Sequence, residues 1–146
     1  PGAITRLVDM GVKPFLVAAA TRAILAQRLV RKFCKKCETT HVLTEGERKA
    51  LDLTEEDLKD ARTLVGAGCK ACDGLGYKGR MGLFEVLELD DQVRRLIISG
   101  EPSTVLRDHA LEQGLMKTLR SDGIRKVIAG STSVSEVIRV TSADEH

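Results

Sequence analysis

The sequence predicts a mixed α/β fold that is mostly helical. Its 146 residues are 42% hydrophobic but include only three Phe, one Tyr and no Trp, so the core must consist mainly of Leu, Ile, Val and Ala. That composition favours helices. Several amphipathic stretches also begin at capping residues and end at glycine. Two apolar runs, at residues 25–33 and 81–89, are instead typical of strands.

Two helices are expected before the first strand. Ile4, Leu7 and Val8 follow helical spacing up to Gly11, and Pro14 suits the first turn of a second helix. This second helix is expected to bury an apolar stripe made of Phe15, Leu16, Ala19, Ala20, Ala23 and Ile24. The run at 25–33 then predicts a strand, because it ends at a cysteine pair rather than at a helix cap. A helix is the alternative.

The segment between the two predicted strands is polar and rich in turns. Thr44 with Glu47, and Thr54 with Asp57, form capping-box patterns that predict short helices near residues 45–51 and 55–62. Glycines crowd the region around residues 69–72 and indicate a tight loop there. They are Gly66, Gly68, Gly74, Gly76 and Gly79.

The second predicted strand, from residue 81 to 89, shows no clean alternation of apolar and polar residues. This indicates a strand covered on both faces. Four helices are expected after it. The first is capped by Asp90 or Asp91 and closed by Gly100, and the second is opened by Pro102. The third carries Leu115, Leu119, Val127 and Ile128, and the last begins with a capping box of Ser133 and Glu136. The tail from Ser142 is expected to fray.

The chain has four cysteines, Cys34, Cys37, Cys69 and Cys72, arranged as two C-x-x-C pairs with 31 residues between them. Each pair can place two thiolates on one side of Zn²⁺, and four thiolates complete a tetrahedron with no open position. The pattern therefore predicts a structural zinc site. Two disulfides or two redox dithiols are the alternatives. His41 lies close to the first pair but exceeds the number of ligands required.

The position of the cysteine pairs gives the zinc a structural meaning. The strand at 25–33 runs into the first pair, and the strand at 81–89 follows the second. Zinc would clamp the base of a long insertion between two strands that could pair antiparallel, and it would offset the entropic cost of closing that loop.

Charge and hydropathy exclude some classes of function. The chain has 23 Lys and Arg against 21 Asp and Glu, a net charge of +2, which argues against a general nucleic-acid-binding surface. No apolar run reaches about 18 residues, so no membrane span is expected. The chain begins at Pro1 without an initiator Met or a signal-peptide pattern, so it is expected to be part of a longer protein.

Five runs, together with the cysteine pairs, carry a resemblance to a known family. The runs are Ala3–Val12, Leu25–Arg31, Gly76–Leu87, Asp122–Val127 and Gly130–Thr141. In these residues the chain resembles the secretion ATPases of the GspE/PilB class, which power type II secretion and type IV pilus assembly. The likeness covers almost the whole chain in order, but it does not separate the secretion branch from the pilus branch.

The resemblance implies a homo-hexameric motor with a RecA-like P-loop ATPase domain. It also implies a cytoplasmic location, peripheral at the bacterial inner membrane, and inner-membrane secretion or pilus platform proteins as partners. This chain would be the C-terminal portion of that domain. Residues 1–33 would end the ATPase core, 34–79 form the tetracysteine zinc subdomain, 80–90 return as a core strand, and 91–146 form a helical bundle. Without the rest of that domain, the sheet would have an open edge and one of its faces would be exposed.

The chain departs from the family because the phosphate-binding pattern G-x-x-x-x-G-K-[ST] is absent from its sequence. ATP and Mg²⁺ would bind in the full-length parent only, so no catalytic residue is expected here and the chain alone is expected neither to bind ATP tightly nor to hydrolyse it. Arg28 could contact nucleotide or a neighbouring subunit, or it could be a solvated or salt-bridged arginine.

Other charged residues and other functions stay open at this point. Glu85 could pair with Arg28 or Arg31 across the two strands. The basic group of Arg31, Lys32, Lys35 and Lys36 is either a solvated face or a partner site.

A chaperone-type zinc module is suggested by the C-x-x-C-x-G-x-G run at residues 69–76. A nucleic-acid-binding zinc module is the other alternative, against which the charge balance and the scarcity of aromatic residues count.

Overall fold

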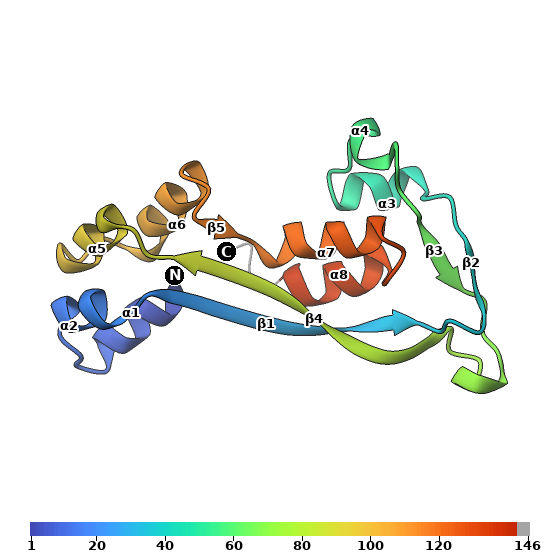
Figure 1. The fold of residues 1–146 in the computed structure, drawn as a ribbon, viewed down its shortest axis with the longest axis horizontal. Coiled ribbons are helices and arrows are strands. Elements are labelled where there is room, and N and C mark those ends of the chain that lie inside the picture. The colour runs from blue at the N-terminus through green and yellow to red at the C-terminus, as the bar shows by residue number, and fades with distance from the viewer. Residues whose placement is uncertain (143–146) are drawn as a thin grey trace. The chain divides into compact units, whose positions relative to one another are not determined.

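The computed structural model describes residues 1–142 and confirms a mixed α/β fold in which helical residues outnumber strand residues (Figure 1). The elements are α1 (Gly2–Asp9), α2 (Pro14–Ala20), β1 (Ala23–Phe33), β2 (Glu38–Thr40), α3 (Glu45–Ala50), α4 (Glu55–Leu58), β3 (Leu64–Gly66), η1 (Lys70–Cys72), β4 (Tyr77–Glu88), α5 (Asp91–Ile98), α6 (Ser103–Glu112), β5 (Met116–Lys117), α7 (Leu119–Ile128) and α8 (Val134–Thr141). None of these helices has the length and apolarity needed to cross a bilayer.

Two small sheets connect these elements. One has the strand order β1-β4-β5 and the other pairs β2 with β3. Leu89 N–H donates to the carbonyl of Arg22 (3.1 Å) beside one end of the β1–β4 pair, and Cys34 N–H donates to the carbonyl of Gly76 (2.9 Å) beside the other. The strands therefore run antiparallel, as their arrows show (Figure 1). The expected strand at 25–33, rather than a helix, is confirmed.

The chain divides into two compact units. The first comprises Pro1–Ala26 and Phe84–Thr118. Its core is built by α1, α2, α5 and α6 together with the end of β4, the residue after it and β5. The buried residues are Ile4, Val17, Ala18, Leu87, Leu89, Val93, Ile97, Leu106, Ala110 and Met116.

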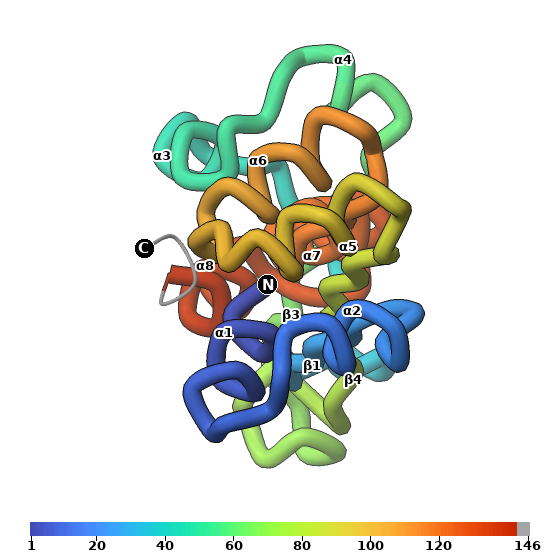
Figure 2. The backbone as a smooth tube through the Cα atoms, turned by 90° about the vertical axis from the view of Figure 1, so that its left-hand side faces the viewer, coloured from blue at the N-terminus to red at the C-terminus, as the bar shows by residue number. Residues whose placement is uncertain are grey.

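The second unit comprises Gln27–Leu83 and the chain from Leu119 onward. Its core residues are Val30, Leu43, Leu51, Leu83, Leu119, Val127, Val134 and Val137. Helices α7 and α8 lie side by side within it (Figure 2). A Cβ added at Gly123 would lie 2.4 Å from Cγ1 of Val137, so only glycine permits this close packing of the two helices.

The expected apolar stripe of the second helix is wrong. Helix α2 ends at Ala20, and it buries Val17 and Ala18, whereas Phe15 and Leu16 are 53% and 49% exposed. Ala23 and Ile24 belong to β1 instead. The reason is a shift of the buried face: the Val17–Ala18 side packs toward α5, from which Arg94 donates to the carbonyl of Ala18.

The expectation that the second strand is covered on both faces is also wrong for the part of the chain that the structure describes. Leu83 and Leu87 of β4 are buried, as is Leu89 just after it, whereas Phe84 is 39% exposed and Glu88 is exposed. The alternation is therefore present in space, although Phe84 and Val86 conceal it in the sequence. Leu115 precedes β5 and does not belong to the helix that follows.

Two capping boxes in the insert are confirmed, at Thr44–Glu47 and Thr54–Asp57. The third is only half formed. Ser133 Oγ accepts a hydrogen bond from the N–H of Glu136 (3.2 Å), but the Glu136 carboxylate is used elsewhere. The expected fraying concerns the tail from Ser142, and residues 143–146 lie outside the described part of the chain.

Glu136 is a buried carboxylate that ties α8 to β1. It is 1% exposed and accepts hydrogen bonds from the backbone and the guanidinium of Arg31, both at 2.8 Å, and from Arg139 at 2.9 Å. Arg31, which was a possible partner of Glu85, also lies 4.3 Å above the ring of Tyr77. Pairing of Glu85 with Arg28 stays a prediction. Burial raises the pKa of Glu136, but the bonds from Arg139 and Arg31 outweigh it and lower the pKa to about 2.

The first prediction concerns Glu136→Gln, which keeps the size of the side chain and removes its charge. We expect a loss of about 1–3 kcal/mol in the free energy of unfolding at pH 7, because two guanidinium groups lose a charged acceptor. Urea titration measures this loss. The control Glu45→Gln removes an exposed carboxylate that pairs with Lys49 on α3, and we expect a change within about 0.5 kcal/mol.

The same comparison has a pH signature. Because the pKa of Glu136 is depressed from 4.5 to about 2, its contribution is complete above pH 4.5 and is lost as the pH falls toward 2. The difference in stability between the native chain and Glu136→Gln should therefore shrink over that interval. A difference that stays constant down to pH 2 would contradict this role.

Candidate metal centre

The four cysteines lie where the strands of the insert begin and end. Cys34 directly follows β1, and Cys37 directly precedes β2. Cys69 is the N-cap of η1 and Cys72 is its last residue, and both lie between β3 and β4. Residues from two distant segments of the sequence are thus brought together at the base of the insert, as the two C-x-x-C pairs predicted.

The spacing of the sulfur atoms matches a tetrahedron. The Sγ–Sγ distances are 3.9 Å for Cys34–Cys69, 3.8 Å for Cys37–Cys72 and 3.8 Å for Cys69–Cys72, and all four atoms lie within 4.8 Å of one another. A zinc ion bound by four thiolates at about 2.3 Å requires an S–S separation of about 3.8 Å. The thiols are free, so the disulfide alternative is not the state found here. Four cysteines are therefore positioned to bind one metal ion.

Backbone amides point at these sulfurs. The N–H groups of Cys69 and Gly76 donate to Sγ of Cys72 at 3.2 and 3.3 Å. Burial raises the pKa of the Cys72 thiol, but these amides outweigh it and lower the pKa to about 6. Burial and the neighbouring sulfurs raise the pKa of Cys37 to about 12, against a lowering bond from Gly68. Deprotonation of one thiol thus raises the pKa of its neighbours, and a divalent cation bound among them would relieve this repulsion between thiolates.

Two glycines permit the backbone to pass close behind the second pair. A Cβ added at Gly66 would lie 1.9 Å from the carbonyl oxygen of Gly76, and one added at Gly76 would lie 2.4 Å from that of Gly66. Gly76 also has φ +75°. The expected tight loop is confirmed, and its glycines are required by contact with backbone as well as by backbone conformation.

His41 belongs to the insert and lies away from the sulfur cluster. Its Nε2 atom lies 3.0 Å from the carboxylate of Glu47, the acidic member of the first capping box. The backbone of His41 closes the insert, since its N–H donates to the carbonyl of Thr63 (3.0 Å) and its carbonyl accepts from Thr63 Oγ (2.5 Å). His41 is thus part of the support of the insert.

Arg28 is an exposed residue of β1 that interacts within the chain. A role for it toward nucleotide or a neighbouring subunit stays a prediction. Sequence reasoning missed the part that Glu136 plays, because the Ser133 pattern explained this residue as a helix cap. The apolar residues around it, Val134 and Val137, were the available signal that it faces the core.

Comparison with known proteins identifies the family. Residues 1–139 match the family described as Type II/IV secretion system protein. The chain belongs to this family. The resemblance inferred from the sequence is therefore confirmed, on a match that includes both cysteine pairs.

Curated relatives from both branches are similar to the chain. The type IV pilus assembly ATPase PilB of Thermus thermophilus is 42% identical over 139 residues, which cover 95% of this chain and 16% of the relative. The type II secretion system protein E of Aeromonas hydrophila is 42% identical over 147 residues, covering 98% and 28%. The type II secretion system ATPase E of Vibrio cholerae is 39% identical over 141 residues, covering 96% and 27%. The chain thus spans less than a third of these relatives.

The second prediction concerns the metal. We expect about one zinc per chain by inductively coupled plasma mass spectrometry, and a small fraction of that for Cys72→Ser, since a hydroxyl is a poor replacement for a thiolate. His41→Ala serves as the matched control and should retain the metal. Loss of zinc from His41→Ala alone would show that the ligand set is different.

The third prediction compares two glycines with similar φ angles, one at which a side chain would cause only backbone strain and one at which it would also clash with a neighbouring carbonyl. Gly74 has φ +76° and open space around it, whereas a Cβ at Gly76 would meet the Gly66 carbonyl. Gly74→Ala should cost about 1 kcal/mol from backbone strain. Gly76→Ala should cost at least about 2 kcal/mol more, from the added clash. Thermal unfolding of the zinc-loaded chains measures both, and equal losses would contradict the close approach.

Proposed function

We propose that this chain is the C-terminal, zinc-containing part of an ATPase motor that drives type II protein secretion or type IV pilus assembly. The observation that carries the proposal is the family match over residues 1–139, which spans a cluster of four thiols with tetrahedral spacing. Relatives with the names of both kinds of ATPase are about equally similar to the chain, so the proposal includes both branches.

The metal we propose is Zn²⁺ in a structural role, held by Cys34, Cys37, Cys69 and Cys72. Soft thiolates in a tetrahedron favour zinc over hard cations such as Mg²⁺. Cys34 and Cys72 are buried, and four protein ligands leave no position for water or substrate. Bound zinc would neutralise part of the negative charge of the thiolates and would cross-link the two C-x-x-C pairs. The chain itself directs two amides at Sγ of Cys72 and buries Cys34 and Cys72, while Cys37 and Cys69 are partly exposed.

The exposed apolar surface of the first unit supports a larger domain around this chain. Met10, Phe15, Leu25 and Phe84 are 73%, 53%, 62% and 39% exposed. Exposed apolar side chains of this size are candidates for contact with a neighbouring surface. We propose that further parts of a RecA-like ATPase domain cover them, with 1–33 and 80–90 as core segments, 34–79 as the zinc subdomain and 91–146 as the helical bundle.

The remaining features of the motor follow from the family. We propose a homo-hexamer that works with inner-membrane platform proteins, lies in the cytoplasm at the inner membrane, and binds ATP and Mg²⁺ through residues outside this chain. Arg28 is a candidate for a nucleotide or subunit contact. The chaperone-type and nucleic-acid-binding alternatives have no comparable support, because each rested on one feature, whereas the family match covers both pairs and the helices.

The fourth prediction tests this division of labour. The purified, zinc-loaded chain should show no ATPase activity above background, because the phosphate-binding pattern G-x-x-x-x-G-K-[ST] is absent from its sequence. A coupled phosphate-release assay measures this, with a full-length secretion ATPase as the positive control. Zinc content is determined on the same sample, so that an inactive preparation is known to be folded around its metal. Turnover by the chain alone would contradict the proposal.

A further inference from the structure

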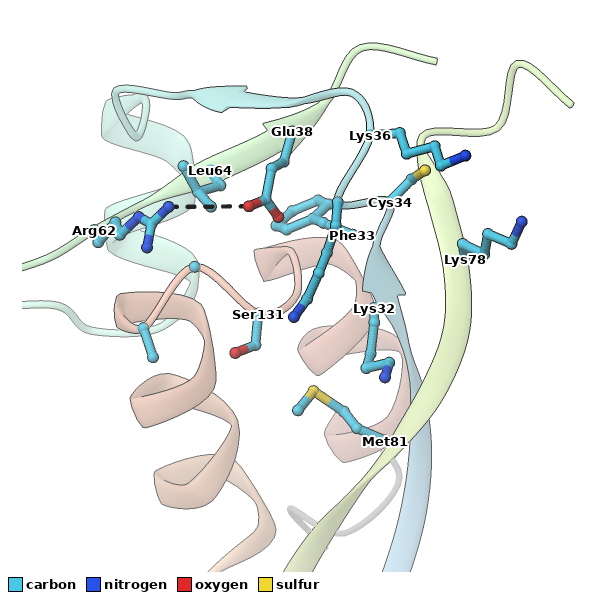
Figure 3. Close-up of a pocket in the computed structure, with 13 residues that line it drawn as sticks. Lys32, Phe33, Cys34, Lys36, Glu38, Arg62, Leu64, Lys78, Met81 and Ser131 are labelled. Carbon is cyan, nitrogen blue, oxygen red and sulfur yellow. Dashed lines mark ion pairs between the residues drawn. The ribbon is translucent and has the colours of Figure 1, made fainter. Parts of the chain in front are cut away.

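A pocket of about 600 Å³ opens beside the first cysteine pair, within the second unit (Figure 3). Its walls come from the end of β1 and the Cys34–Lys36 turn after it, from the starts of β2 and β4, from β3 with the residue Arg62 before it, and from the loop that follows α7. Pockets of roughly 300–1,000 Å³ are typical of small-molecule sites. The hollow is therefore large enough for a small organic ligand.

The charge of the lining is strongly positive. Five cationic side chains line the pocket, and Glu38 is the only carboxylate among the described lining residues. The whole chain has a net charge of only +2, so positive charge is concentrated here. Four thiolates around a divalent ion would carry two negative charges nearby, which offsets only part of this excess. The cations are Lys32, Lys35, Lys36, Arg62 and Lys78.

Three of these cations are not used by the fold. Lys78 Nζ donates to the carbonyl of Ala71 (2.8 Å), and Arg62 lies 3.9 Å from Glu38, as the dashed line shows (Figure 3). Within residues 1–142, Lys32, Lys35 and Lys36 have no ion pair or side-chain hydrogen bond. Their ammonium groups are therefore available for a ligand.

The end of α7 does not account for these lysines either. Cations often satisfy the last carbonyls of a helix. Here the carbonyls of Lys126, Val127 and Ile128 already accept the N–H groups of Ser131 (2.9 Å), Gly130 (2.9 Å) and Arg62 (2.8 Å). The helix end is thus capped by backbone, and the lysines serve no capping role.

The base of the pocket is held by backbone contacts. Phe33 N–H donates to the carbonyl of Ser131 (3.1 Å), which fixes β1 to the loop after α7. A Cβ added at Gly130 would lie 2.4 Å from the carbonyl oxygen of Arg62, so this loop packs directly on the chain before β3. Leu64 and Met81 add half-buried apolar surface beside the lysines. The pocket thus combines a fixed apolar wall with free positive charge.

We propose that this pocket binds a small phosphate-bearing ligand. Lys32, Lys35 and Lys36 contact the phosphate oxygens, and Leu64 and Met81 contact the organic part. A small molecule is favoured over an extended peptide or a flat membrane surface, because the site is a hollow of about 600 Å³ whose walls come from segments far apart in the sequence. This assignment is independent of the motor function proposed above.

The test uses the zinc-loaded 146-residue chain and two probes, inorganic pyrophosphate and guanosine diphosphate, without Mg²⁺. Isothermal titration calorimetry in 150 mM salt should show saturable one-site binding, with a Kd below about 1 mM. Amide NMR shifts should map to residues 32–36, 62–64 and 129–131. Tighter binding of the nucleotide assigns the ligand to the organic phosphates, and equal affinity assigns it to phosphate groups of any source.

Two double variants remove equal charge from the same unit. Lys32→Gln/Lys36→Gln alters the pocket, and Lys49→Gln/Lys59→Gln removes exposed lysines of the insert that pair with Glu45 and Glu56. The pocket variant should weaken binding at least about tenfold, and the control variant should weaken it less than about twofold. Retained zinc content shows that both variants are folded.

Several outcomes would overturn the assignment. These are the absence of saturable binding, equal weakening by both double variants, or NMR shifts away from the pocket. Binding of a poly-glutamate peptide or of anionic-lipid vesicles at the same residues, without pyrophosphate or nucleotide binding, would identify a docking surface for an acidic protein or a membrane instead.

Discussion

The arrangement of the second unit depends on the convergence of four thiols. Cys34 directly follows β1 and Cys37 directly precedes β2, while Cys69 and Cys72 lie in the turn between β3 and β4, so the cluster joins the ends of these strands. The strands β2 and β3 are only three residues long, and such a pair is marginal by itself. A metal cross-link at its base, as proposed above, would offset the entropic cost of bringing residues 34 and 69 together.

The charged and polar groups of this unit have distinct partners. The amides of Cys69 and Gly76 donate to Sγ of Cys72, whereas Lys35 and Lys36, between Cys34 and Cys37, have no such partner among the described residues. Farther along β1, Arg31 is directed to a different acceptor, the buried Glu136, and to the face of Tyr77. Adjacent basic residues of one strand thus have separate roles, because successive side chains point to opposite faces.

Sequence reasoning predicted the elements whose signals are local. Caps at Thr44, Thr54 and Asp90, and the stops at Gly11 and Gly100, were correct because a cap depends on neighbours within four residues. Each C-x-x-C pair is a local signal, and the meeting of the two pairs across 31 residues was predictable because a tetrahedral metal site needs four ligands. The partition into domains 1–33, 34–79, 80–90 and 91–146 stays a prediction.

The parts that the sequence did not reveal depend on distant partners. Strands β2, β3 and β5 have two or three residues and exist only through their pairing. The buried face of α2 is set by α5, some 75 residues away, and the same is true of Glu136, whose partner Arg31 is 105 residues distant. The basic pocket combines segments separated in sequence by up to 99 residues, from Lys32 to Ser131, so the run of basic residues at 31–36 indicated its charge but not its other walls.

The closure of the insert by His41 and Thr63 has a consequence for how such chains can vary. Hydrogen bonds from the backbone N–H of His41 and the hydroxyl of Thr63 join the two residues, so the two ends of the segment at residues 42–62 are held next to each other. Helix α4, within this segment, buries none of its own residues. Because the cost of closing a loop grows only slowly with its length, residues can be gained or lost around α4 with little effect on the thiols below. The insert is therefore a natural position for a label or an added domain.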